Sequence, residues 1–196
     1  MLQQLALTLG AYQTNCYIIW NEGSDACVII DPGYNPDTIL TRVGLLGKQV
    51  EAILLTHGHF DHVGGVKAIA ETTGCKVYLC TEDLAMPQQF TAGKLLYTDS
   101  YKEGDVLELA GLTVKVLHTP GHTMGSVCLL TEDTLFAGDT LFQGSCGRTD
   151  LPGGDWAQIL QSLRRLKELP ENTRVFPGHG PDTTIGEEKL WNPYMR

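Results

Sequence analysis

Residues 53–65, ILLTHGHFDHVGG, carry the clearest signals for both the fold and the chemistry expected of this chain. Its apolar start, Ile53–Leu55, is typical of a strand that is covered on both faces. Polar side chains of the metal-binding type follow directly, namely His57, His59, Asp61 and His62. Their spacing does not fit one face of a helix, so we expect a strand end that turns into a helix N-terminus. The glycines between and after them let that turn fold tightly around a small object.

Three later stretches repeat this arrangement. HTPGHTMGS (118–126) places His122 in a turn between strands, FAGDTLF (136–142) places Asp139 at a strand end, and PGHGPD (177–182) places His179 after the last strand. A polar surface loop at 57–62 would leave these three as coincidences. Four strand ends that each present an imidazole or a carboxylate predict a metal site suited to zinc, iron or manganese.

Composition and charge narrow the class of partner. The 196 residues are 42% hydrophobic and carry a formal net charge of −9, which argues against a nucleic-acid partner and against an anionic membrane surface. No apolar run is long enough to span a bilayer, and the N-terminus does not resemble a signal peptide. The six cysteines show no C-x-x-C spacing, so we expect free thiols in a reducing cytoplasm.

Alternating and helical patterns predict one mixed α/β domain over residues 1–196, because no shift in composition marks a boundary. The expected strands are 5–9, 16–20, 26–30, 50–55, 76–80, 105–110, 112–118, 126–131, 134–137 and 174–176. One expected helix begins at Pro36, and two others cover residues 63–73 and 156–166. Residues 81–104 are expected to be a loop or short helices. Their apolar side chains, Met86, Phe90, Leu95 and Tyr97, suit either a lid over a substrate or the anchors of a surface loop.

Taken together, the motifs T-H-x-H-x-D-H (56–62), P-G-H-T (120–123), G-D-T (138–140) and G-H-G (178–180) resemble those of the metallo-β-lactamase superfamily. They are most similar to its glyoxalase II (hydroxyacylglutathione hydrolase) branch. Only residues 180–196 follow His179, so the chain resembles the short bacterial proteins of that branch. The resemblance implies a four-layer αβ/βα sandwich, with two mixed sheets face to face and helices outside.

The same resemblance implies a centre for two divalent metal ions. His57, His59 and His122 would hold the first ion, Asp61, His62 and His179 the second, and Asp139 would bridge them. Zinc is the first expectation, and a carboxylate at 139 leaves iron and manganese open. Asp31 is expected either to support a ligand histidine or to be a simple turn residue. His118 matches no ligand position, and we take it as structural.

The implied reaction is hydrolysis of a small thioester, such as an S-acyl derivative of glutathione, by a hydroxide that bridges the two metals. Asp61 would also orient that hydroxide. In the segment SCGRTD, Arg148 would contact the thiol carrier, or it is an ordinary surface arginine. Asp150 stands where this branch commonly has a tyrosine that contacts glutathione. The thiol that carries the acyl group therefore stays undefined.

Other functions are also compatible with these motifs. A persulfide dioxygenase would hold one iron with His57, His122 and Asp139. A lactonase or another ester hydrolase would use the same metal chemistry, and a binding module without activity would keep the fold alone. A β-lactamase is less favoured, because position 139 is not a thiolate. The sequence leaves the oligomeric state undetermined.

Overall fold

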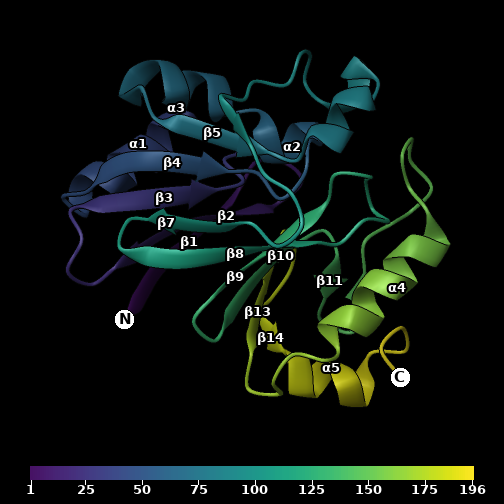
Figure 1. Cartoon of the computed structure of the whole chain (residues 1–196). Helices are drawn as coiled ribbons and strands as arrows, with labels where there is room; N and C mark the ends of the chain where they lie inside the picture. The colour runs from purple at the N-terminus through teal and green to yellow at the C-terminus, as the bar shows by residue number, and fades with distance from the viewer.

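The computed structural model describes residues 1–196, which form two six-stranded sheets packed face to face with helices on both outer sides (Figure 1). The first sheet contains, in spatial order, β1 (Leu2–Leu9), β2 (Thr14–Asn21), β3 (Ala26–Ile30), β4 (Gln49–Leu54), β5 (Lys76–Leu79) and β6 (Asp99–Ser100). Strands β1 to β3 are antiparallel, whereas β3 to β6 run parallel. This is the predicted four-layer sandwich.

The second sheet is built mostly from hairpins. It contains, in spatial order, β14 (Thr183–Thr184), β13 (Arg174–Pro177), β10 (Thr134–Gly138), β9 (Val127–Thr131), β8 (Leu112–His118) and β7 (Val106–Leu109). Only β10 and β13 pair in parallel. A short ribbon of β11 (Leu141–Phe142) and β12 (Ser145–Cys146) follows β10.

The helices cover the two outer faces. They are α1 (Pro36–Leu45), α2 (Phe60–Val63), α3 (Val66–Thr73), α4 (Trp156–Leu166) and α5 (Ile185–Trp191), with 3₁₀ turns η1 (Thr81–Ala85) and η2 (Gln88–Phe90). Figure 1 shows α1 and α3 on the first sheet and α4 and α5 on the second. None of the helices has the length and hydropathy that crossing a membrane requires.

Three hydrophobic clusters lie between these layers. Within β2, Ile19 belongs to the cluster between the sheets, and its neighbour Ile18 belongs to the cluster beneath α1 and α3. Successive strand residues point to opposite faces, so a strand buried on both faces reads as a continuous apolar run. A third cluster joins the second sheet to α4 and α5 through residues such as Leu163 and Ile185.

Strand direction brings the polar turns to one edge of the molecule. The parallel strands β3 and β4 end at the same edge, where Asp31 and the 57–62 segment follow. Strands β8 and β10 both pair antiparallel with β9, and β13 is parallel to β10, so these three end at a common edge as well. The turns after them carry the remaining predicted ligands.

The predicted helix 63–73 is wrong at its start, because two helices occupy this region. Helix α2 ends at Val63 and α3 begins at Val66, with Gly64 and Gly65 between them. A Cβ on Gly65 would lie 2.6 Å from the carbonyl oxygen of Pro32, to which the Gly65 N–H donates a hydrogen bond of 2.8 Å. This close approach of two backbones needs glycine and interrupts the helix.

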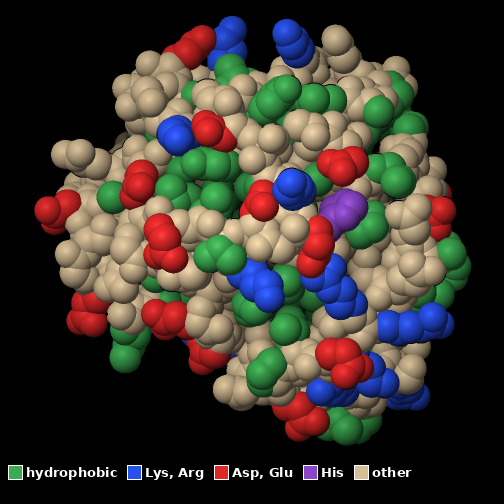
Figure 2. Space-filling model, in the orientation of Figure 1, with side chains coloured by type: hydrophobic (Ala, Val, Ile, Leu, Met, Phe, Trp, Pro, Cys, Tyr) green, Lys and Arg blue, Asp and Glu red, His purple; other side chains and the backbone are tan.

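Residues 81–104 contain the two 3₁₀ turns, which agree with the predicted loop or short helices, and the short strand β6, which was not predicted. The ribbon β11–β12 and helix α5 were likewise not predicted. All six cysteines are free, as expected, and Cys146 alone is not fully buried. Acidic and basic side chains are interspersed on the face shown in Figure 2.

Gly65→Ala should lower the free energy of unfolding by about 1–3 kcal/mol, because the added methyl must displace the Pro32 carbonyl. Gly44→Ala is the matched control: this exposed position within α1 has open space around a Cβ, so alanine should stabilise the protein by about 0.5–1 kcal/mol. Urea unfolding of both variants measures the difference. Equal effects of the two substitutions would contradict the packing described for α2 and α3.

Candidate metal centre

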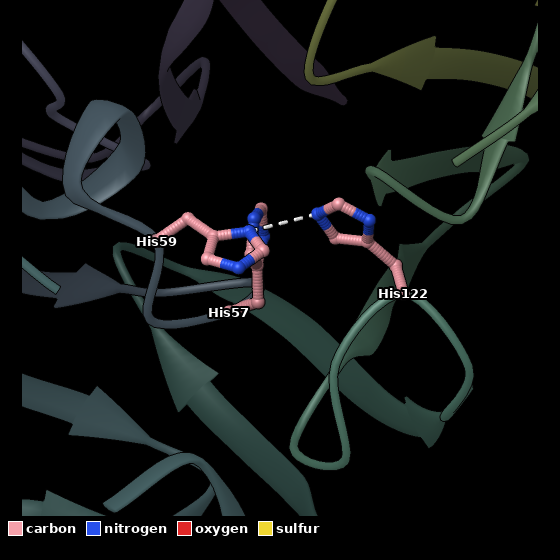
Figure 3. Close-up of side chains that lie close together, drawn as sticks. All are labelled: His57, His59 and His122. Carbon is pink, nitrogen blue, oxygen red and sulfur yellow. Dashed lines mark hydrogen bonds between the residues drawn. The ribbon is translucent and has the colours of Figure 1, made fainter. Parts of the chain in front are cut away.

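Three histidines from two loops meet at the edge between the sheets. His57 and His59 follow β4, and His122 lies in the turn between β8 and β9; their rings converge in Figure 3. One nitrogen from each ring lies within 4.8 Å of the others. His59 Nδ1 is 2.9 Å from His122 Nε2. All three side chains are buried.

A second group lies beside the first. Asp61, His62 and His179 also place one ligand atom each within 4.8 Å of the others. The Nε2 atom of His179 is 3.2 Å from Asp61 Oδ2 and 3.3 Å from His62 Nε2. Asp61 and His62 belong to α2, whereas His179 follows β13, so this group too is assembled from distant parts of the chain.

Asp139 lies between the two groups. Its Oδ2 atom is 3.5 Å from His122 Nε2 and 3.5 Å from His179 Nε2, and its Oδ1 atom is 3.4 Å from His62 Nε2. The structure therefore brings together all seven side chains that the sequence singled out. A single carboxylate faces both triads, which is the position that a bridging group would need.

Asp31 orients two of the rings from behind. The buried Asp31 carboxylate accepts hydrogen bonds from the Thr56 N–H (2.8 Å), from Thr56 Oγ1 (2.6 Å) and from His62 Nδ1 (2.9 Å). The Thr56 hydroxyl uses its proton on Asp31, so it accepts from His57 Nδ1 at 3.1 Å. Both rings therefore direct an Nδ1–H at these partners, and Nε2 is the nitrogen left to face the site.

Backbone carbonyls fix the other two tautomers. His122 Nδ1 donates to the carbonyl of Arg148 at 2.7 Å, and His179 Nδ1 donates to the carbonyl of Tyr12 at 3.1 Å. A carbonyl only accepts, so Nδ1 of each ring carries an N–H and Nε2 is the nitrogen directed into the site. Neither partner could be predicted from the sequence, because a backbone group leaves no signal in the residue types.

A buried carboxylate that the sequence analysis also missed connects the two histidine loops. Asp83, in η1, accepts hydrogen bonds from the Gly58 N–H (2.7 Å), the Gly125 N–H (2.7 Å) and Thr123 Oγ1 (3.0 Å). Gly58 lies between His57 and His59, and Thr123 and Gly125 follow His122. The polar pattern TED at 81–83 was the available signal.

The electrostatics of the site favour a cation over free protons. Burial, together with neighbouring imidazoles, holds the pKa of His57 well below its usual value and lowers the pKa of His59 to about 4. These rings are therefore neutral at pH 7. Burial opposes the charged form of His62 as well, but Asp139 and Asp31 outweigh it and raise the pKa of that ring. The carboxylates thus attract positive charge to the centre, whereas the His57 and His59 rings resist protonation.

Unsatisfied atoms test whether metal ions fit these residues. Five buried side-chain atoms in the chain lack a hydrogen-bond partner, and three of them, His57 Nε2, His59 Nε2 and Asp139 Oδ1, lie at this centre. Buried polar atoms are almost always paired, so such a concentration requires an explanation. Imidazole nitrogens and carboxylate oxygens are ligands of zinc, iron and manganese, and the donor set fits such ions.

A cavity of about 520 Å³ opens over the centre. Five of the seven residues line it, together with a mainly apolar and aromatic wall: Tyr12, Phe60, Phe90, Phe142, Cys146 and Leu151. Of the four apolar residues proposed as a lid, only Phe90 lines this cavity. Leu95 instead packs in the core beneath α1 and α3, so the hypothesis that this side chain forms part of a lid is wrong.

Arg148, the predicted carrier contact, stands at the rim of the same cavity. Its guanidinium forms a two-point pair with Asp150, with Nε to Oδ1 at 2.6 Å and Nη2 to Oδ2 at 2.8 Å. Both side chains are mostly exposed. Arg148 thus contributes in two ways, since its backbone positions His122 and its side chain is held by the residue two positions further on.

Two opposed mixed sheets with paired His/Asp clusters at their edge define a class of metalloproteins with a binuclear centre. The chain belongs to the metallo-beta-lactamase superfamily, whose sequence profile matches residues 9–179.

Individual relatives agree with this assignment. GloC, a hydroxyacylglutathione hydrolase of Haemophilus influenzae, is 36% identical over 200 residues, which cover 94% of each protein. The crystal structure of BLEG-1, a B3 metallo-beta-lactamase, is 36% identical with a TM-score of 0.91, covering 98% of this chain and 99% of that one. TTHA1623, solved in a di-iron-bound form, is 40% identical with a TM-score of 0.87, covering 97% and 99%.

Asp31→Asn should weaken metal binding by about 10- to 100-fold, the usual effect of removing a partner that orients a ligand. In either orientation the amide would direct its N–H₂ group at a donor, either the Thr56 N–H or the pair of Thr56 Oγ1 and His62 Nδ1. Equilibrium dialysis against zinc measures the affinity, and the exposed Asp25→Asn serves as the matched control. Unchanged affinity in a folded Asp31→Asn protein would contradict the role assigned to this carboxylate.

Proposed function

We propose that this protein is a metallo-hydrolase that cleaves a small thioester at the seven-residue centre. The observation that carries the proposal is that two triads of ligand-type side chains, with Asp139 between them, open into one cavity, and that His57 Nε2 and Asp139 Oδ1 are buried there without protein partners. Similarity to a hydroxyacylglutathione hydrolase over 94% of the chain supports the reaction class.

Each side chain has an assigned place in this proposal. His57, His59 and His122 would hold one divalent ion, Asp61, His62 and His179 a second, and Asp139 would contact both. Such a pair of ions acidifies water and polarises a carbonyl group. Zinc is our first assignment, and iron is supported by the di-iron-bound relative.

The chain itself orients the reactants. The Asp61 carboxylate is held by Thr14 Oγ1, which donates to its Oδ2 at 3.2 Å, and we assign Asp61 to orient the attacking water. Asp31, Thr56 and the carbonyls of Arg148 and Tyr12 hold Nδ1 of four rings, which leaves Nε2 of each ring directed at the site. Preorganisation of this kind reduces the reorganisation that the reaction would otherwise require.

The cavity supports an acyl thioester as substrate. Its wall includes the edge-to-face pair of Tyr12 and Phe60, with ring centroids 5.2 Å apart, and the rings of Phe90 and Phe142. These surfaces suit an apolar acyl chain and a thioester sulfur. We further propose that residues 1–196 act as one domain, and that the free cysteines reflect a reducing cytoplasm.

A panel of substrates tests the reaction. The metal-loaded protein should hydrolyse S-acyl thiols, and Asp139→Asn should lower kcat/KM by about 100-fold or more, the loss typical of removing a group that supports developing charge. The Asp25→Asn control should keep full activity. Turnover of a β-lactam alone would assign the reaction of the BLEG-1 relative instead. Oxygen uptake with a persulfide and no thioester cleavage would favour the dioxygenase reading.

Asp150→Asn should release the Arg148 guanidinium toward the cavity. We expect KM for S-acyl thiols whose carrier bears carboxylates to fall by about two- to fivefold, the scale of one exposed ion pair, with kcat unchanged. Arg148→Gln in the same background should abolish the gain. Matched assays with a neutral thiol carrier should show no change in KM. A gain for both carriers would mean that Arg148 does not read carrier charge.

A further inference from the structure

A third group of ligand-type side chains lies outside the seven-residue centre. Cys80, Glu82 and His118 place one ligand atom each within 4.8 Å of the others. Cys80 immediately precedes η1, Glu82 lies within η1, and His118 is the last residue of β8. The superfamily motif absorbs none of their side chains, and the proposed hydrolysis does not use them.

Cys80 is a protonated thiol beside a carboxylate. Its side chain is buried, and Sγ donates a hydrogen bond of 2.8 Å to Glu82 Oε2. Burial and the Glu82 carboxylate raise the pKa of this thiol to about 12. Such a thiol is a poor nucleophile at neutral pH. Its proton can nevertheless be replaced by a metal ion, which binds thiolate and carboxylate together.

His118 presents the third ligand with its tautomer already fixed. Its Nε2 atom lies 2.7 Å from the carbonyl oxygen of Met124. Because a carbonyl only accepts, Nε2 carries the proton and the lone pair is on Nδ1. Metal-binding histidines usually donate their other ring N–H in this way. This hydrogen bond is independent of the Cys80–Glu82 contact and points to the same use.

We propose that Cys80, Glu82 and His118 form an additional site for a zinc-class divalent cation, separate from the catalytic centre. On binding, the Cys80 S–H bond breaks, its proton passes to solvent and a metal–sulfur bond forms. The charge of the ion is then balanced by one thiolate and one carboxylate. Thiolate, imidazole and carboxylate are the ligand types that zinc takes from proteins.

The surroundings leave the site open for a fourth ligand. Glu82 is exposed and His118 is only half-buried, so solvent reaches two of the three ligands. The site also lies next to a structural connection, since Asp83 follows Glu82 and holds Gly58 and Gly125. A bound ion would connect η1 to the end of β8. It would thereby stabilise the position of Asp83, which holds both histidine loops.

Cobalt is the probe, because a cobalt–thiolate bond gives a charge-transfer absorption that imidazole and carboxylate ligands do not produce. The wild-type protein titrated with Co²⁺ should show this band, and Cys80→Ser should lose it and bind one equivalent of cobalt fewer. Cys75→Ser is the matched control, since Cys75 is a buried free cysteine that directly precedes β5, whereas Cys80 directly follows it. The control should keep both the band and the stoichiometry.

Two further variants keep the test decisive if Cys80→Ser folds poorly. Glu82→Gln removes a proposed ligand at an exposed position and should weaken cobalt binding, followed at the thiolate band, by about tenfold or more, at least the loss caused by removing a group that only orients a ligand. Asp139→Asn should reduce loading of the catalytic centre but keep the band, which separates this proposal from the proposed hydrolysis. Absence of the band in the wild-type protein, or its survival in Cys80→Ser, would overturn the proposal.

Discussion

The carboxylate of Asp31 joins the fold to the site. It follows β3 with a positive φ of 50°, a conformation that aspartate tolerates better than most residues, and it is almost fully buried. It receives the backbone and hydroxyl of Thr56, at the end of β4, and the ring of His62. Through these contacts the ends of two parallel strands determine the positions of His57 and His62. Loss of this anchor would leave two imidazoles without a defined tautomer.

A second constraint comes from the contact between the two sheets. Val127 N–H, at the start of β9 in the second sheet, donates to the Thr56 carbonyl at 2.8 Å. Within the first sheet, Tyr101 after β6 donates its hydroxyl to the carbonyl of Leu55 after β4. Asp83 adds hydrogen bonds to the loops that carry His59 and His122. The two loops are therefore fixed to each other by backbone groups as well as by side chains. Rigid support of this kind is what a centre built from several distant segments requires.

The local electrostatics differ from those of the whole molecule. The protein carries a formal charge of −9, and its centre concentrates Asp31, Asp61 and Asp139 beside five imidazoles. Since His57 and His59 resist protonation while His62 and His179 have a raised pKa, protons alone satisfy the site poorly. Divalent cations would pair with the carboxylates and use the neutral nitrogens at the same time. This complementarity explains why so many buried polar groups are retained together.

Most strands, their ends and the seven ligand-type side chains could be predicted from residue patterns, because apolar periodicity and glycine-flanked His/Asp turns are local signals. The four layers were implied only by the family resemblance, which the superfamily profile confirms. The break between α2 and α3, the Arg148 and Tyr12 carbonyls behind His122 and His179, the Asp150 contact that holds Arg148, and the meeting of Cys80 with His118 emerged only from the folded structure. These features depend on backbone groups and on pairs of residues distant in the chain, which residue types do not encode until the sheets are assembled.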